Sequence, residues 1–145
     1  GRTKHFINAF GEEVVVENAE RAIATASEQT GAQINNFTAA PRYFGENEKG
    51  THEWIVEFEK DPDNMDQFVK LLDQTLRDIN SDYDAKRYRD LALSQPIVHQ
   101  AAPGTFYQWM RKRGKLGGQH KVPRLSNSRE YLDDILSLMS ASTKV

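Results

Sequence analysis

The stretch from residue 104 to residue 124 holds the side chains that are best suited to chemistry. Six Lys or Arg residues and no Asp or Glu lie between residues 111 and 124. The rest of the chain carries 13 basic and 21 acidic residues, a net charge of −8, so this stretch is a positive island on an acidic body. Concentrated positive charge favours an anionic ligand such as a phosphate or a nucleotide. On charge alone, a solvated basic loop without a ligand is the alternative.

A helix and a glycine-rich loop are expected to position these charges. Thr105, with Gln108 three residues later, has the pattern of a capping box, and Gly114 is a typical helix stop. Apolar side chains between them fall on one helical face: Phe106, Trp109 and Met110. The loop that follows delivers Lys121, and Pro123 favours an extended backbone there. No G-x-x-x-x-G-K-[ST] string is present, so the loop is not a P-loop.

Two short strings resemble the C-terminal domain of the Gretchen Hagen (auxin-responsive promoter) family of acyl-acid amido synthetases. They are Gly104-Thr105-Phe106 and Gln119-His120-Lys121-Val122-Pro123-Arg124, against a family pattern of G-T-F, a variable helix and Q-x-K-x-P-R. The family belongs to the adenylate-forming enzymes. The resemblance implies a ligase that activates a carboxylic acid with ATP to give an acyl-adenylate and pyrophosphate. The amine of an amino acid, or another amine, then displaces AMP.

The resemblance also implies roles for single residues. Lys121 would be the catalytic residue, supplied by a mobile lysine loop, and would stabilise the negative charge on the transferring phosphoryl group and on pyrophosphate. The alternative is that Lys121 only pairs with a surface carboxylate. Gln119 and Arg124 are candidate cofactor-binding residues, although Arg124 could equally anchor the loop to its own domain. The implied cofactors are ATP and Mg²⁺, held mainly by a larger N-terminal domain; no metal ligands are expected here.

The start of the chain resembles the hinge of the same superfamily. Gly1-Arg2-Thr3-Lys4, followed by Ile7, Asn8 and Gly11, fits the pattern G-R-x-[DK]-x-x-I-[KN]-x-x-G. The resemblance implies that Arg2 contacts the nucleotide and that Lys4 is the hinge residue about which the domain turns. A plain entry strand is the alternative. The residues at 8–12 and 115–118 look nearer to bacterial than to plant members.

Length and composition indicate one soluble domain. The chain has 145 residues, of which 38% are hydrophobic and 28% charged, and it has no cysteine. No apolar run approaches 18 residues and no signal segment is apparent, so we expect a cytoplasmic protein without a membrane partner. We expect residues 1–145 to form the mobile C-terminal domain of a larger adenylate-forming enzyme, with residues 1–4 as the hinge. Its partners would be the N-terminal adenylation domain, a carboxylic acid, and an amino acid or amine, and the isolated chain would be inactive.

Hydrophobic periodicity predicts an α+β sandwich. Strands are expected in residues 5–16 (two, around Gly11), 32–44 (broken by Pro41), 51–59 and 96–102. Helices are expected in residues 17–30, from Asp61-Pro62 to residue 79, in residues 82–92, from Thr105, and from Asn127, where Glu130 completes a capping box. Helices and strands in mixed order give a two-layer fold, with helices on an antiparallel or mixed sheet of about three to five strands.

The strand expected in residues 51–59 has two distinct faces. Its aromatic and aliphatic face holds Trp54, Val56 and Phe58, while Glu53 and Glu57 share the other. His52 lies at the start of the strand on the aromatic face. A lone histidine there is expected to be structural rather than catalytic.

A binding module for a small anion or for RNA is the alternative function. Tyr107 and Trp109, beside Arg111 and Arg113, could stack on bases. The overall charge of −2 and the confinement of the basic residues to one stretch argue against a nucleic-acid partner. A degenerate family member kept for protein contacts is a further possibility.

Overall fold

A computed structural model describes residues 6–45, 49–90, 92–112 and 122–143. Its elements, in chain order, are β1 (Phe6–Ile7), β2 (Val14–Val15), α1 (Val16–Thr30), β3 (Gln33–Tyr43), β4 (Gly50–Lys60), α2 (Met65–Ile79), α3 (Ser81–Arg87), a 3-10 turn (Tyr88–Asp90), β5 (Ile97–Ala101), α4 (Thr105–Lys112) and α5 (Glu130–Thr143). Strands β1 and β2 pair with each other, and a second sheet has the order β3-β4-β5.

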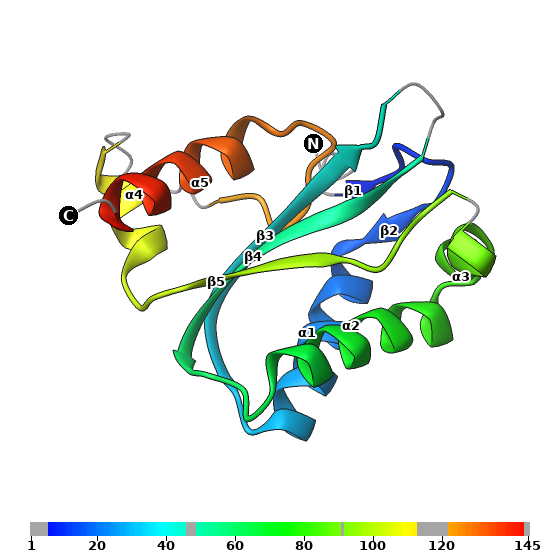
Figure 1. Ribbon diagram of the computed structural model, residues 1–145, viewed down its shortest axis with the longest axis horizontal. Helices are drawn as coiled ribbons and strands as arrows, with labels where there is room; N and C mark the ends of the chain where they lie inside the picture. Colours follow the sequence, from blue (N-terminus) through cyan, green and yellow to red (C-terminus); the bar gives the residue numbers. More distant parts are fainter. Residues whose placement is uncertain (1–5, 46–48, 91, 113–121, 144–145) are drawn as a thin grey trace.

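The three-stranded sheet is mixed and is covered by helices. Strands β3 and β4 form an antiparallel hairpin, whereas β5 returns through α2 and α3 to lie parallel to β4. Helices α1 and α2 lie on one face of this sheet and α4 and α5 lie on the opposite face (Figure 1). The predicted α+β class, with helices on a small mixed sheet, is confirmed. Among the described residues, no helix has the length and apolar character needed to cross a membrane.

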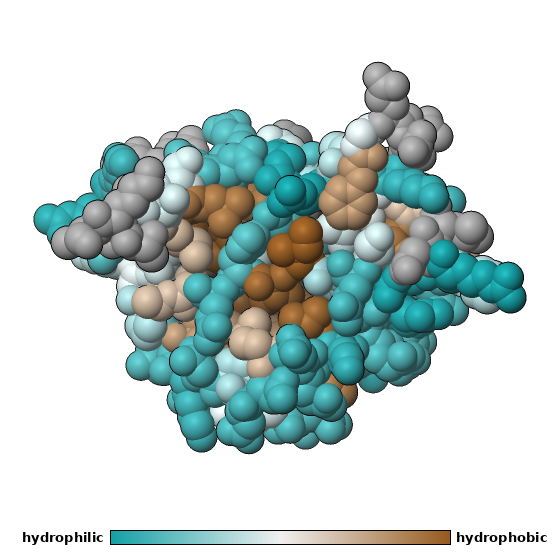
Figure 2. Space-filling model, viewed as in Figure 1, coloured by the Kyte–Doolittle hydropathy of each residue, from teal (hydrophilic) through white to brown (hydrophobic). Residues whose placement is uncertain are grey.

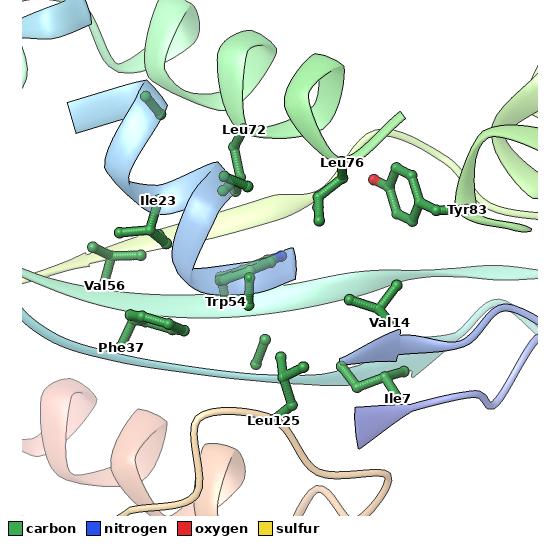
Figure 3. Packing of buried hydrophobic residues seen from close by; sticks show 14 of the residues in the cluster. Ile7, Val14, Ile23, Phe37, Trp54, Val56, Leu72, Leu76, Tyr83 and Leu125 are labelled. Carbon is green, nitrogen blue, oxygen red and sulfur yellow. The ribbon is translucent and has the colours of Figure 1, made fainter. Parts of the chain in front are cut away.

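The larger core lies between the sheet and the pair of helices α1 and α2. Trp54 is completely buried, and its ring centre lies 5.7 Å from that of Phe37 on the neighbouring strand. Leu72 and Leu76, one helical turn apart on α2, are also fully buried and approach the same side of the sheet (Figure 3). The periodic apolar positions of α2 therefore mark its core face, as the sequence indicated.

Two predicted helix starts were wrong by about one turn. Helix α2 begins at Met65 rather than at Asp61-Pro62, because Asn64 is the N-cap and its Oδ1 accepts the Gln67 N–H at 2.9 Å. Helix α5 begins at Glu130 rather than at Asn127. In both places a second residue able to cap the helix stands closer to the helical segment than the one that the sequence pattern favoured.

Strand β3 is not broken at Pro41, contrary to the sequence prediction. Pro41 pairs in register with His52 of β4, and the strand continues to Tyr43. A proline is tolerated here because β3 lies at the edge of the three-stranded sheet, where one side needs no continuous row of N–H donors.

Strand β4 is buried on both faces. Every residue from position 50 to position 58 is buried, because one face meets α1 and α2 and the other meets α4 and α5. The predicted separation of the apolar face from the glutamate face is correct, but the glutamate face is not solvated. A buried carboxylate requires charged or hydrogen-bonding partners, so Glu53 and Glu57 must each be satisfied within the domain.

Glu53 is satisfied by three basic side chains from three separate parts of the chain. Its carboxylate lies 2.6 Å from His99 Nε2, 2.9 Å from Arg129 Nη1 and 3.6 Å from Arg42 Nη1. Burial alone would raise the pKa of Glu53, but the hydrogen bonds and charges of His99 and Arg129 outweigh burial and hold that pKa below its ordinary value. The ion pair with Arg129 fixes the start of α5 against the sheet.

Glu57 fixes the start of α4. Its Oε1 accepts the N–H of Phe106 at 2.8 Å, and its Oε2 accepts a hydrogen bond from Asn35 Nδ2 at 3.0 Å. A carboxylate at this place also meets the positive end of the helix dipole. The predicted capping box is not how this helix starts: the Thr105 hydroxyl donates to the carbonyl of Ala102 at 2.7 Å, and the cap comes from the sheet.

Replacing Glu53 by Gln is expected to lower the free energy of unfolding by about 1–3 kcal/mol at neutral pH. The pKa of Glu53 is depressed in the folded state, so its contribution is present above the ordinary carboxyl pKa and is lost as the pH falls through the folded value. The difference in unfolding free energy between wild type and Glu53→Gln should therefore shrink below about pH 4. Urea unfolding across a pH series measures it. Glu13→Gln, at an exposed position, is the control. A difference that stays constant with pH would contradict the ionic role of Glu53.

Replacing Glu57 by Ala is expected to loosen the start of α4, because the buried Phe106 N–H then has no carboxylate to accept its hydrogen bond. We expect a loss of about 1–3 kcal/mol in unfolding free energy. We also expect faster amide hydrogen exchange in the first turn of α4. Unchanged exchange in residues 106–109 would show that another group caps this helix. Glu57→Gln keeps one acceptor oxygen and should lie between wild type and Glu57→Ala.

Candidate functional site

Four of the five predicted site residues lie outside the described residues. They are Arg2 and Lys4 near the start of the chain, and Gln119 and Lys121 in residues 113–121, which we call the lysine stretch. The chain is described on both sides of the lysine stretch, where α4 ends at Lys112 and where Val122 begins the next segment. The geometry of these two flanks determines where the chain enters and leaves the lysine stretch.

The chain leaves the lysine stretch along the edge of β3. We call residues 122–126 the exit segment. The N–H of Ala39 donates to the carbonyl of Arg124 at 2.9 Å, and the N–H of Ser126 donates to the carbonyl of Ala39 at 3.2 Å. The hydroxyl of Thr38 donates to the carbonyl of Pro123 at 2.6 Å. The exit segment is therefore held by backbone pairing, which fixes its position along the strand.

Burial of two side chains adds to this pairing. Leu125 is fully buried in the larger core, and Val122 is 5% exposed and belongs to the smaller core between the sheet and helices α4 and α5. The residue that directly follows Lys121 is thus part of the folded body. The sequence predicted an extended segment around Pro123 but not its attachment to β3, which depends on a strand far away in the chain.

The chain enters the lysine stretch from α4, which is packed on α5. Phe106 and Trp109 are buried, and Trp109 Nε1 donates to Asp134 Oδ2 of α5 at 2.8 Å. The Trp109 ring also meets Tyr131 edge-on, with ring centres 5.8 Å apart. Trp109 is therefore a core residue and is not available to stack on a nucleic-acid base. Tyr107 is 57% exposed.

Arg124 is the one predicted site residue that the structure describes. Its guanidinium carbon lies 4.7 Å from the ring centre of Phe37, and its Nε lies 3.8 Å from Glu20 of α1. A cation over an aromatic face is a favourable contact, whereas an ion pair of this length between part-exposed groups contributes little. Arg124 thus contacts its own domain, as one of the two predicted alternatives requires.

A pocket of about 300 Å³ lies beside Arg124, between α1 and β3. Its lining includes Glu20, Ser27, Asn36, Phe37 and Arg124. One guanidinium beside one carboxylate is a poor match for a triphosphate, which would need several positive groups. Within the described ranges, no group of three or more His, Cys, Asp or Glu side chains is placed to hold a metal ion.

The segment that follows the predicted hinge is also firmly held. Glu12, 1% exposed, accepts the N–H of Phe10 at 2.8 Å and lies 2.5 Å from Nε2 of the buried His52. Gly11 has a φ of +90°, which allows the tight turn between β1 and β2. His52 is a structural residue, as predicted, and its partner Glu12 was not foreseen. The place of His52 on the aromatic face of its strand was the signal that such a partner was needed.

Hydrophobic side chains also reach the surface near the free edge of β5. Figure 2 shows a group of them in the middle of one face, over the β5 region, surrounded by hydrophilic side chains. Ile97 and Val98 of β5 are part-exposed. This edge lies on the opposite side of the sheet from the exit segment, since β3 and β5 are the two outer strands.

Comparison with solved structures identifies relatives of this fold. GH3.15 acyl acid amido synthetase matches with a TM-score of 0.74 and 19% sequence identity, over 94% of this chain and 25% of that chain. AtGH3.15 acyl acid amido synthetase in complex with 2,4-DB matches with a TM-score of 0.68 and 18% identity, over 87% of this chain and 24% of that chain. This chain thus spans about a quarter of the length of these structures. At these identities the likeness shows a shared fold.

A search of curated proteins finds no match in sequence. The family comparison is decisive, because residues 17–130 match the model of the GH3 family C-terminal domain. That range includes β3, β4, the exit segment and the whole lysine stretch. The family that the G-T-F and Q-x-K-x-P-R strings indicated is confirmed. The chain belongs to the GH3 family and corresponds to the C-terminal domain of its members.

Proposed function

We propose that this chain is the C-terminal domain of an ATP-dependent acyl-acid amido synthetase and that it supplies Lys121 to the adenylation step. One observation carries the proposal beyond family membership. The residue after Lys121 is buried, and the exit segment is pinned to β3 by backbone hydrogen bonds. A cation delivered to a reacting phosphoryl group must be positioned, and this attachment is what positioning requires.

The proposed reaction has two steps. In the first, a carboxylate oxygen of the acyl acid attacks the α-phosphorus of ATP, which forms the acyl-adenylate and releases pyrophosphate. In the second, the amine of an amino acid or another amine attacks the acyl carbon, which forms the amide and releases AMP and a proton. In the second step negative charge develops on the phosphate of the leaving AMP, whereas on pyrophosphate it develops only in the first step. A lysine ammonium near the pyrophosphate oxygens stabilises the transition state of the first step.

The remaining predicted residues have supporting roles in this proposal. Arg2 and Gln119 contact the nucleotide, and Lys4 is the hinge between this domain and an N-terminal adenylation domain that holds ATP, Mg²⁺ and the acyl acid. The contacts of Arg124 with Phe37 and Glu20 support an anchoring role for Arg124 over direct nucleotide binding. We place this enzyme in the cytoplasm.

The alternative of an RNA-binding module loses its strongest stacking residue. Trp109 is 4% exposed and hydrogen-bonds to Asp134, so base stacking would require α4 to detach from α5. A module that binds a small anion remains the competing proposal, and it predicts anion binding without acid-dependent use of ATP.

ATP–pyrophosphate exchange by the full-length protein, with a panel of carboxylic acids, is the decisive experiment. We expect acid-dependent exchange in wild type. We expect Lys121→Ala to reduce the exchange rate by about 10²–10³-fold, the effect typical of losing one electrostatic stabiliser of the transition state.

Lys115→Ala is the matched control, because it removes one positive charge from the same stretch and should leave exchange nearly unchanged. Exchange that survives Lys121→Ala would preserve the reaction class and remove Lys121 from the catalytic step. The absence of exchange with every acid tested, together with binding of phosphate or nucleotide, would favour the anion-binding module.

The isolated chain of 145 residues is expected to show no exchange, even when it is folded. The described residues place one part-exposed guanidinium, and no metal cluster, beside the pocket at Arg124. The same exchange assay, applied to a sample whose fold is verified by circular dichroism, tests this. Turnover by the isolated chain would contradict the proposal that an N-terminal adenylation domain holds ATP, Mg²⁺ and the acyl acid.

A further inference from the structure

Asn8 and Asn127 are joined by two reciprocal hydrogen bonds. The backbone N–H of Asn8 donates to Oδ1 of Asn127 at 3.0 Å, and Nδ2 of Asn127 donates to Oδ1 of Asn8 at 2.9 Å. The two residues lie 119 positions apart in the sequence. Both are exposed, so burial of apolar surface does not account for their pairing.

Asn8 belongs to the first firmly held part of the chain after the predicted hinge. It directly follows β1, whose residue Ile7 is fully buried, and its carbonyl accepts the N–H of Gly11 at 3.1 Å in the turn to β2. The pair of Glu12 with His52 then fixes this turn to β4. A turn at the predicted hinge, residues 1–4, would therefore be transmitted to the rest of the domain through Asn8 and its neighbours.

Asn127 lies at the end of the segment that carries the chain away from Lys121. It directly follows the exit segment, whose last residue, Ser126, donates its N–H to Ala39. Leu125 of the exit segment and Ile7 of β1 are both fully buried in the same core, and both are labelled in Figure 3. The two asparagines thus join two segments whose neighbouring apolar side chains share one core.

Two roles are open to Asn127 by its type and position: N-cap of α5, or hydrogen-bond partner of Asn8. Asparagine is among the best helix N-caps, and α5 begins three residues later, at Glu130. Instead, the Glu130 N–H donates to the Ser128 hydroxyl at 3.2 Å. The side-chain oxygen and nitrogen of Asn127 both form hydrogen bonds with Asn8. The residue that the sequence pattern favoured as the N-cap of α5 therefore bonds instead to the segment after the predicted hinge.

We propose that Asn8 and Asn127 are a positioning pair that ties the exit from the lysine stretch to the strand after the hinge. This rests on the proposed function above. When the domain turns at Lys4, the pair makes the exit segment turn with β1 as one body, so that Lys121 arrives at a defined position. The pair contacts no reacting atom and acts through the backbone that carries Lys121.

The proposal predicts that the two steps of the reaction respond differently. In this proposal the charge of Lys121 acts where pyrophosphate departs during adenylation, whereas attack of the amine on the acyl-adenylate releases no pyrophosphate. Loss of the pair should lower the kcat for ATP–pyrophosphate exchange about tenfold, because misplacement of a catalytic group slows a reaction steeply. The KM for ATP should change little. Amide formation from a chemically prepared acyl-adenylate should keep its wild-type rate.

The chain offers a graded series of variants of the full-length protein. Asn8→Asp keeps both hydrogen bonds, because a carboxylate still accepts from Asn127 and the backbone N–H is unchanged. Asn8→Ala loses one bond and Asn127→Ala loses both. The exchange rate should follow that order, and the double variant should be no slower than Asn127→Ala. Gln74→Ala, which removes one exposed amide hydrogen bond to Asp78 on α2, is the matched control and should match wild type.

Hydrogen exchange of the exit segment gives a readout that does not depend on activity. In the full-length protein, Asn127→Ala and Asn8→Ala should speed amide exchange in residues 122–127, whereas Asn8→Asp and Gln74→Ala should not. Two results would show that the pair is only a structural contact. One is faster amide hydrogen exchange with an unchanged rate of adenylation. The other is an equal fall in the rates of adenylation and amide formation together with a lower Tm. Unchanged amide exchange and unchanged adenylation in Asn127→Ala would overturn the proposal outright. If wild type shows no adenylation at all, the proposed function fails, while amide exchange still decides whether the pair holds the exit segment.

Discussion

The buried titratable side chains of β4 are the constraint on which the rest of the structure depends. A central strand covered on both faces leaves no water for His52, Glu53 and Glu57, so each requires a partner from another element. His52 finds Glu12 in the turn after the predicted hinge, and Glu53 finds Arg129 at the start of α5. Glu57 accepts a backbone N–H at the start of α4. One strand thus holds the turn between β1 and β2, the start of α4 and the start of α5.

Much of this arrangement could be read from the sequence, because it depends on local patterns. Alternation along residues 51–59 separated the faces of β4, and the apolar stripe of α2 identified its core face. The family strings indicated a C-terminal domain of the GH3 family, which the match over residues 17–130 confirms. The start of α2 was misplaced because a proline after an aspartate is a strong local signal, while Asn64 supplies the cap in the folded chain.

The features that escaped the sequence are those that join distant residues. Nothing near Glu57 indicates that it caps a helix 49 positions away, and nothing near Asn127 indicates a bond to Asn8. Arg124 showed the same limit: its type suggested an anion, while its position over Phe37 depends on pairing of the exit segment with β3. Residue type therefore indicated the class of chemistry, and the fold determined which charges are free to take part in it.

The proline in β3 has a consequence for the register of the exit segment. Ala39 uses its N–H and its carbonyl to pair on either side of Leu125, as in the first rung of a parallel ladder. The next donor in such a ladder would be the N–H of residue 41, which proline does not have. The carbonyl of Pro41 instead accepts a hydrogen bond from Arg129. The ladder therefore stops after one rung, and a slip of two residues would lack a donor. A proline in the neighbouring strand thereby excludes one alternative register of the exit segment, and with it one alternative number of residues between Lys121 and the sheet.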